Sequence, residues 1–200
     1  MSKIIANSIQ HTQNGAAVFT LPTSDGSTGQ VIKTDGSGAL SFVAQPAAGI
    51  TMADQWRINS NFASQNEVIS FNWERVDNSF AQIGTGMSYS SGVFSFPQTG
   101  IYLVEFHAQM YLTNTAARYM GINLQFTEDN SNYTTRCEGY GNVSNNSTSY
   151  IQAQVKYILD ISDISNRKVR FKTDSATTVS YAGSSVENRT VATFIRLGDT

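Results

Sequence analysis

The chain has 200 residues, of which 40% are hydrophobic, 11% aromatic and only 14% charged, with a net charge of −2 at pH 7. This length suits one substantial domain with an appendage, and the aromatic content argues against a disordered chain. Because the charge is slightly negative, the composition lacks the basic surface that nucleic acids and anionic membranes attract, and we expect no nucleic-acid partner.

The first 52 residues differ in pattern from the rest of the chain. No long apolar run follows Met1, so we expect neither a signal peptide nor insertion into a membrane. Two segments, 23–29 and 34–38, contain Asp-Gly, a pair that favours turns because Gly accepts positive φ. The apolar pieces beside these turns predict a β-meander of three very short strands, at 18–21, 31–32 and 40–43.

This N-terminal module is too thin to bury its own apolar side chains, since isolated hairpins are marginal in water. We therefore expect it to be stable only against copies of itself or against a larger partner. Residues 45–49, Gln-Pro-Ala-Ala-Gly, are expected to form a linker to the second domain, residues 53–200.

From residue 53 onward the sequence predicts about eight strands separated by Gly, Asn and Ser turns. In 101–112 apolar and polar side chains alternate strictly, a period that suits a strand and not a helix. The pattern predicts an all-β sandwich or jelly roll. The expected strands are 55–58, 67–73, 92–96, 101–112, 119–127, 148–161, 168–173 and 190–197. The expected core residues are Phe94, Phe96, Tyr102, Val104, Phe106 and Tyr157.

Two polar stretches between these strands, 129–147 and 174–188, are expected to be loops. Loops on a β scaffold commonly carry variable binding surface. The tyrosines within them are candidates for contact with a partner: Tyr133, Tyr140 and Tyr181.

Few residues point to chemistry. His107 lies on the polar side of its strand, between Glu105 and Gln109, and no nucleophile motif accompanies it. The carboxylates near 128–130 and 160–163 lack the spacing of a known calcium loop. We predict no catalytic residue, no metal site and no cofactor. The single Cys137 has no partner for an intramolecular disulfide, so the core or oligomerisation must hold the fold.

A group of residues between positions 78 and 106 forms a recognisable signature. It comprises Asn78, Phe80, Gly92-Val93-Phe94, Pro97, Gly100-Ile101-Tyr102 and Phe106. It resembles the signature of the complement-q-type globular head, a tumour-necrosis-factor-like jelly roll, and the resemblance covers roughly residues 66–197. The chain departs from that family near its end, where Arg196 and Gly198 do not reproduce the closing glycine.

This resemblance implies a homotrimer in which like faces meet on a three-fold axis. The strands also carry more aromatic and Met positions than one sandwich interior holds, so some should be buried between subunits. The residues expected in that interface are Tyr111, Tyr119 and Ile158.

A second resemblance lies in the N-terminal module. Residues 21–42 read Leu-Pro-Thr-Ser-Asp-Gly-Ser-Thr-Gly-Gln-Val-Ile-Lys-Thr-Asp-Gly-Ser-Gly-Ala-Leu-Ser-Phe. This segment is similar to a stretch common in phage fibre and other virion proteins. Ile32 and Phe42 stand where that stretch has Leu and Trp.

Together the resemblances predict a bacteriophage virion structural protein, a trimeric fibre or decoration protein. Residues 1–52 would attach to other virion proteins, and the knob of residues 53–200 would project and bind a host-surface glycan or protein. One alternative is a purely structural head decoration or cement protein that binds nothing outside the particle. Another is an esterase or depolymerase tip that uses His107.

Overall fold

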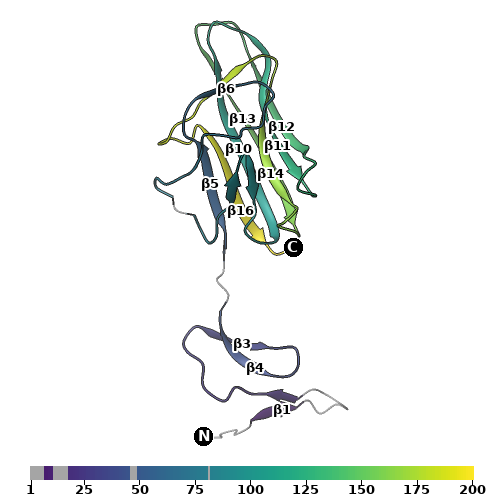
Figure 1. The fold of residues 1–200 in the computed structure, drawn as a ribbon. Helices are drawn as coiled ribbons and strands as arrows, with labels where there is room; N and C mark the ends of the chain where they lie inside the picture. The colour runs from purple at the N-terminus through teal and green to yellow at the C-terminus, as the bar shows by residue number, and fades with distance from the viewer. Residues whose placement is uncertain (1–6, 11–17, 46–48, 81) are drawn as a thin grey trace. The chain divides into compact units, whose positions relative to one another are not determined.

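The structure is a computed structural model that describes residues 7–10, 18–45, 49–80 and 82–200. The chain divides into two compact units, Met1–Gly49 and Ile50–Thr200, where the sequence placed the boundary after residue 52. Most of the expected linker, residues 46–48, lies outside the described residues. The described ranges contain strands and no helix, which confirms the all-β class, and none of their elements is a helix able to cross a membrane (Figure 1).

The N-terminal unit contains two hairpins in place of the expected three-stranded meander. β1 (Ser8–Gln10) pairs with β2 (Val18–Thr20), and β3 (Gln30–Thr34) pairs with β4 (Leu40–Ala44). Only one of the two Asp-Gly segments closes a hairpin. In it, Asp35 Oδ1 accepts hydrogen bonds from the backbone N–H of Ser37 (2.8 Å) and Ala39 (3.0 Å), which lowers the pKa of Asp35. The other, 23–29, connects β2 to β3, which do not pair with each other.

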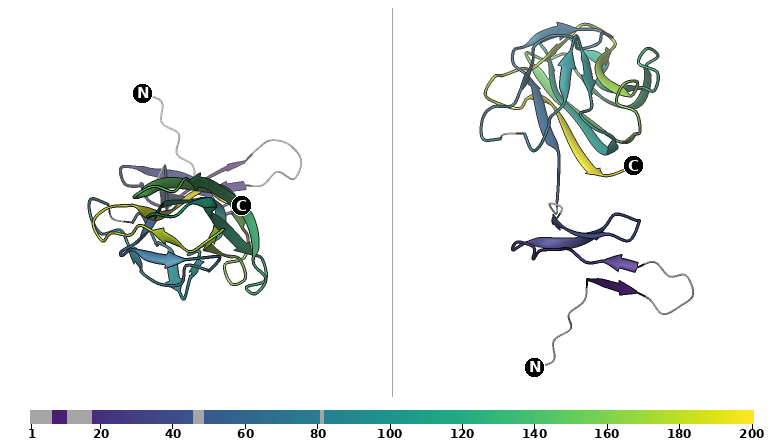
Figure 2. Two further views of the ribbon diagram at one scale, coloured as in Figure 1. Left: turned by 90° about the horizontal axis from the view of Figure 1, so that it is seen from above. Right: turned by 60° about the horizontal axis from the view of Figure 1, so that its bottom comes forward.

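The C-terminal unit is a sandwich of two antiparallel sheets (Figures 1 and 2). One sheet has seven strands in the order β6-β15-β10-β16-β5-β7, with β13 also paired to β10. Its strands are β5 (Ala53–Ile58), β6 (Phe62–Ser64), β7 (Trp73–Arg75), β10 (Gly100–Leu112), β13 (Ser149–Ile161), β15 (Val179–Tyr181) and β16 (Thr190–Gly198).

The second sheet has five strands in the order β12-β11-β14-β9-β8. Its strands are β8 (Ser88–Ser90), β9 (Val93–Ser95), β11 (Ala117–Thr127), β12 (Thr134–Val143) and β14 (Lys168–Ser175). From β10 onward the chain crosses repeatedly between the sheets, so strands that are neighbours in sequence often lie in different layers. This is the jelly-roll arrangement that the strand pattern predicts.

The expected strand at 67–73 is broken. Val68 bridges to Lys172 of β14 in the five-stranded sheet, whereas Trp73 begins β7 in the seven-stranded sheet. Between them Asn72 adopts a φ of 62°, a left-handed conformation that turns the chain. The segment therefore changes sheets, and its apolar pattern serves two short pairings in place of one strand.

The expected loop 129–147 is largely a strand, β12. The stretch is polar, which predicts a loop, but two of its glycines lie where β12 packs closely against β13. A Cβ at Gly139 would lie 3.1 Å from the carbonyl oxygen of Gln154, and one at Gly141 would lie 2.7 Å from Ile151 Cδ1. Glycine at these positions lets β12 approach β13, and the polar composition of the stretch does not reveal this contact.

The core lies between the sheets and is rich in aromatic rings. Five of the six expected core residues are at most 3% exposed: Phe94, Phe96, Tyr102, Val104 and Phe106. The prediction for Tyr157 is wrong, because its side chain is 39% exposed. Tyr157 belongs to β13 and lines a groove of about 250 Å³ together with Phe126 of β11 and Arg136 of β12.

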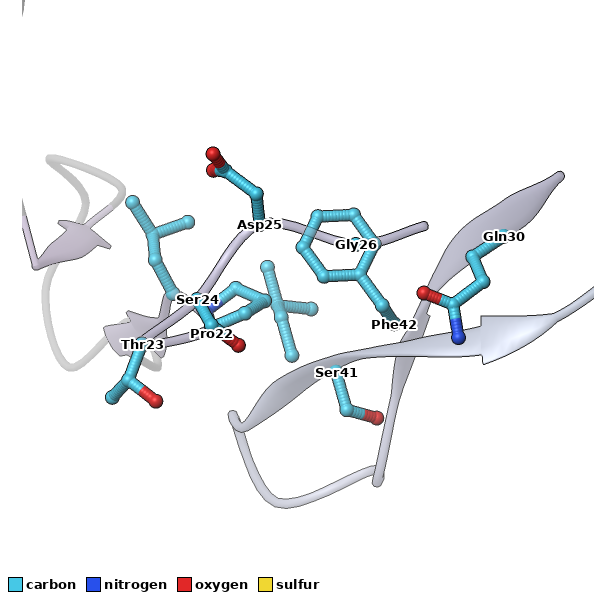
Figure 3. Close-up of a pocket in the computed structure, with 10 residues that line it drawn as sticks. Pro22, Thr23, Ser24, Asp25, Gly26, Gln30, Ser41 and Phe42 are labelled. Atoms are coloured by element: carbon cyan, nitrogen blue, oxygen red, sulfur yellow. The ribbon is translucent and has the colours of Figure 1, made fainter. Parts of the chain in front are cut away.

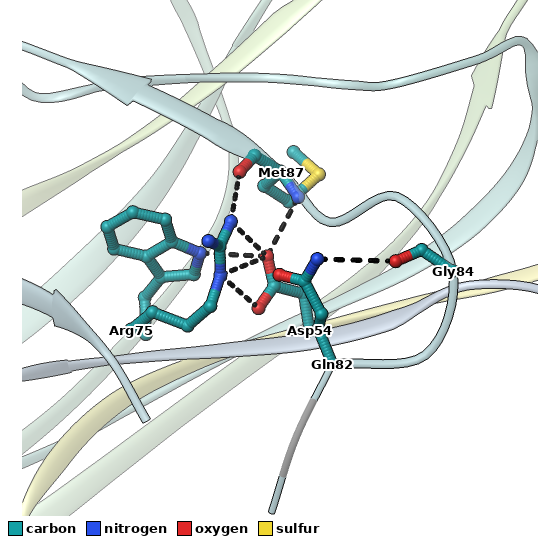
Figure 4. A network of polar contacts seen from close by, with 6 residues as sticks. Asp54, Arg75, Gln82, Gly84 and Met87 are labelled. Atoms are coloured by element: carbon teal, nitrogen blue, oxygen red, sulfur yellow. Dashed lines mark hydrogen bonds and ion pairs between the residues drawn. The ribbon is translucent and has the colours of Figure 1, made fainter. Parts of the chain in front are cut away.

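A buried carboxylate ties the long connection before β8 to the seven-stranded sheet (Figure 4). Asp54 of β5 is fully buried and forms an ion pair with Arg75 of β7 at 3.0 Å. Its Oδ2 also accepts hydrogen bonds from the backbone N–H of Met87 (2.7 Å) and from Trp56 Nε1 (2.9 Å). Arg75 in turn donates to the Met87 carbonyl at 2.7 Å, so the network closes on itself.

Replacing this carboxylate with an amide should destabilise the fold. Asp54→Asn removes the charge and brings an NH₂ group toward donors, with an expected loss of about 1.5–3 kcal/mol in the free energy of unfolding. Glu128→Gln is the matched control, because the Glu128–Arg136 pair is exposed and longer, at 3.6 Å, and should cost less than about 1 kcal/mol. Urea denaturation at one protein concentration compares the two. Equal midpoints for the two variants would contradict a structural role for Asp54.

Candidate interaction surfaces

The outer face of the seven-stranded sheet exposes apolar side chains on its two longest strands. β10 and β13 pair over their whole length, which places Leu103 opposite Ile158 and Tyr111 opposite Tyr150. Ile158 is 59% exposed and Tyr150 is 61% exposed. The rings of Tyr111 and Tyr150 contact each other with centroids 5.3 Å apart. We call this face, defined by Leu103, Tyr111, Tyr150 and Ile158, the β10/β13 face.

The middle of the β10/β13 face is polar. Gln154 donates a hydrogen bond to the Glu105 carboxylate, and His107 lies opposite Gln154 on β13 and Val191 on β16. Partial burial lowers the pKa of His107, and the nearby Glu105 carboxylate opposes that shift. Neither cross-strand neighbour of His107 is a nucleophile. Within the described ranges no group of three or more His, Cys, Asp or Glu side chains is placed to hold a metal ion.

The outer face of the five-stranded sheet carries a different aromatic group. The rings of Tyr119 in β11 and Tyr140 in β12 lie 5.7 Å apart at an interplanar angle of 89°. The Tyr140 hydroxyl lies 2.7 Å from Asp174 Oδ2 and 3.0 Å from Glu138 Oε2. Partial burial and these two carboxylates raise the pKa of Tyr140. The fold therefore places Tyr119 beside Tyr140, on the sheet opposite to Tyr111 and Ile158.

The other two candidate binding tyrosines have intramolecular partners. The Arg170 guanidinium lies 3.9 Å from the centre of the half-buried Tyr133 ring. Tyr181 is fully buried in β15, stacks on Phe62 at 5.1 Å and donates its hydroxyl to the Gly121 carbonyl at 2.9 Å. The prediction that Tyr181 contacts a receptor is therefore wrong. The alternation of Val179 and Tyr181 in the sequence could have predicted this burial, because both side chains point into the core.

Comparison with known proteins defines the fold. No protein-family model matches the chain, and no curated protein matches it significantly. Among solved structures the chain is similar to Eiger TNF from S. frugiperda, with a TM-score of 0.59 and 14% identity over 76% of this chain and 96% of that one. It is also similar to murine APRIL at pH 5.0, with a TM-score of 0.53 and 15% identity over 73% and 98%.

The C-terminal unit is a tumour-necrosis-factor-like jelly roll. The globular domain of zebrafish complement 1qA protein is also found, at a TM-score of 0.48 and 13% identity over 75% of this chain and 99% of that chain. At these identities the likeness describes the fold alone. The jelly roll that the sequence predicts is confirmed.

The N-terminal unit precedes the jelly roll and leaves its apolar side chains in solvent. Among its described residues only Gly38 is buried, while Ile9 and Ile32 are each 57% exposed. A shallow cavity of about 460 Å³ separates the segment 21–26 from β4, with Pro22 and Phe42 among its lining residues (Figure 3). This unit has no core of its own within the described residues, and isolated hairpins are only marginally stable in water.

Proposed function

We propose that this chain is a homotrimeric structural protein of a bacteriophage virion. Residues 1–52 attach to other virion proteins, and the jelly roll forms a knob that projects from the particle and binds a host-surface glycan or protein. The observation that carries the proposal is the exposure of apolar side chains in both units, on the β10/β13 face and throughout the hairpins. Exposed apolar patches of this kind mark interaction sites.

The β10/β13 face supports the trimer. A sheet face with exposed Tyr150 and Ile158 is suited to self-association, and closed cyclic symmetry is the common outcome for soluble homo-oligomers. The resemblance of residues 66–197 to complement-q-type heads implies the same number of subunits. An interface on this face contains the expected residues Tyr111 and Ile158 and leaves Tyr119 outside it.

The N-terminal unit supports the virion role. Its Asp-Gly segments are similar to those of phage fibre proteins, and its hairpins expose Ile9, Phe19 and Ile32. A module without its own core is suited to stacking with copies of itself or to packing on a larger particle. The chain would then be found in the assembled virion, with its stability supplied by the assembly.

The mass of the full chain in solution tests the proposal. We expect light scattering to give three times the chain mass of 21.8 kDa. A particle of 21.8 kDa at micromolar concentration would overturn the trimer. Adsorption of the purified trimer to candidate host cells then separates an attachment protein, which binds, from a decoration protein, which does not.

A further inference from the structure

A second surface feature, separate from the β10/β13 face, has the form of a binding pocket. It lies on the outer face of the five-stranded sheet, has a volume of about 360 Å³ and is lined by Tyr119, Tyr140 and Asp174. The two rings meet nearly at right angles, so they form two walls of a corner. Its volume is at the low end of the range of about 300–1,000 Å³ for small-molecule sites. We call this feature the tyrosine pocket.

The strand register holds the tyrosine pocket in shape. Gly121 of β11 lies directly between Tyr140 of β12 and Asp174 of β14. A Cβ at Gly121 would collide with the Gly139 carbonyl oxygen and with the Tyr140 ring, so only glycine leaves room for the ring at this position. The Tyr140 hydroxyl is held by two carboxylates. The pocket is therefore formed before any ligand arrives, which reduces the entropy lost on binding.

The electrostatics of the tyrosine pocket favour a positively charged ligand. Asp174 and Glu138 place two carboxylates around a single hydroxyl proton. The faces of tyrosine rings attract cations. The chain already shows this preference, because the Arg118 guanidinium lies 5.8 Å from the centre of the Tyr119 ring.

The cations of the chain near the tyrosine pocket do not occupy it. Neither Lys172 nor Arg118 lines the pocket, and within the described residues neither forms an ion pair with Asp174. Asp174 Oδ2 accepts hydrogen bonds only from neutral groups, the Tyr140 hydroxyl (2.7 Å) and Asn123 Nδ2 (3.2 Å), among the described residues. The carboxylate therefore keeps its charge available to a ligand.

We propose that the tyrosine pocket binds an organic ammonium group, in which the cation packs between the Tyr119 and Tyr140 rings and faces the Asp174 carboxylate. Anionic ligands are disfavoured by Asp174 and Glu138. This inference deepens the proposed attachment to a host surface and rests on it, since the ammonium group would belong to a component of that surface. A trimer presents three copies of the pocket, so weak binding at each adds to a larger avidity.

Titration of the full-length protein with tetramethylammonium tests the proposal. Two NMR signals report on the pocket. The backbone amide of Gly121 lies between Tyr140 and Asp174 in the sheet, and the side-chain NH₂ of Asn123 donates a hydrogen bond to Asp174. We expect saturable shifts at both, and an affinity reduced about tenfold or more in Tyr119→Ala and in Asp174→Asn. Val186→Ala is the control, because Val186 is exposed in the connection between β15 and β16 and belongs neither to the pocket lining nor to the β10/β13 face; it should leave the shifts unchanged.

Two results would overturn the ammonium site: no saturable shift with tetramethylammonium, or equal shifts in the wild-type and Asp174→Asn proteins. A response to glucose without a response to the cation would assign a neutral sugar and also reject the proposal. Light scattering on the same samples keeps the two hypotheses apart. A trimer that fails to bind the cation refutes only the pocket, whereas a monomer that binds it refutes only the trimer.

Discussion

Phe94→Ala is expected to lower the free energy of unfolding by about 3–5 kcal/mol, the usual cost of deleting a fully buried aromatic side chain. Phe94 lies in β9 of the five-stranded sheet and is fully buried. Its ring lies 5.1 Å from those of Trp73 and Phe194, which belong to the seven-stranded sheet. Alanine would leave a cavity where the two sheets are held together. Because the cavity is bounded by large rings, little collapse can fill it.

Urea denaturation of the full chain measures this loss, at one protomer concentration because association shifts apparent stability. Phe71→Ala is the matched control, since the Phe71 side chain is 47% exposed and its ring packs edge-on against Phe62. It should cost less than about 1.5 kcal/mol. If Phe94→Ala fails to fold, Phe94→Leu keeps most of the volume and should give a smaller, measurable loss. A midpoint for Phe94→Ala as high as that of Phe71→Ala would contradict the role of Phe94 in joining the sheets.

Ile158→Glu is expected to convert the proposed trimer to a monomer. Ile158 is 59% exposed in the single chain, so the change should leave the jelly roll folded. In the trimer the same side chain would lie at a subunit contact, where an unpaired carboxylate in a dry interface carries a large desolvation cost. Light scattering should show the mass fall to 21.8 kDa while circular dichroism stays unchanged.

Val186→Glu is the control for this dissociation. Val186 is 66% exposed in the connection between β15 and β16, outside the two strands that define the β10/β13 face. The same new charge there should leave the mass at three times that of the chain. If the Ile158→Glu variant still has the mass of a trimer, the interface lies on another surface, such as the outer face of the five-stranded sheet.

Local pattern was enough to predict most of the jelly roll. The alternation in 101–112 corresponds to β10, and the expected strand at 148–161 corresponds to β13. Where prediction failed, two distant segments decided the structure. The polar stretch 129–147 predicts a loop, but residues 134–143 pair with β11 and pack against β13. The segment 67–73 predicts one strand, but it changes sheets after Val68. Neither contact leaves a periodic signal in the segment itself.

The sequence alone determined the all-β class and which face of each long strand is apolar, because alternation with period two is a property of one strand. Only the tertiary structure decided which apolar side chains are buried by other strands and which polar side chains contact one another. It buries Tyr181, leaves Tyr157 exposed, and brings Tyr119, Tyr140 and Asp174 together around Gly121. These outcomes depend on the order and register of strands that are far apart in the chain, and the pattern of a single strand does not contain that information.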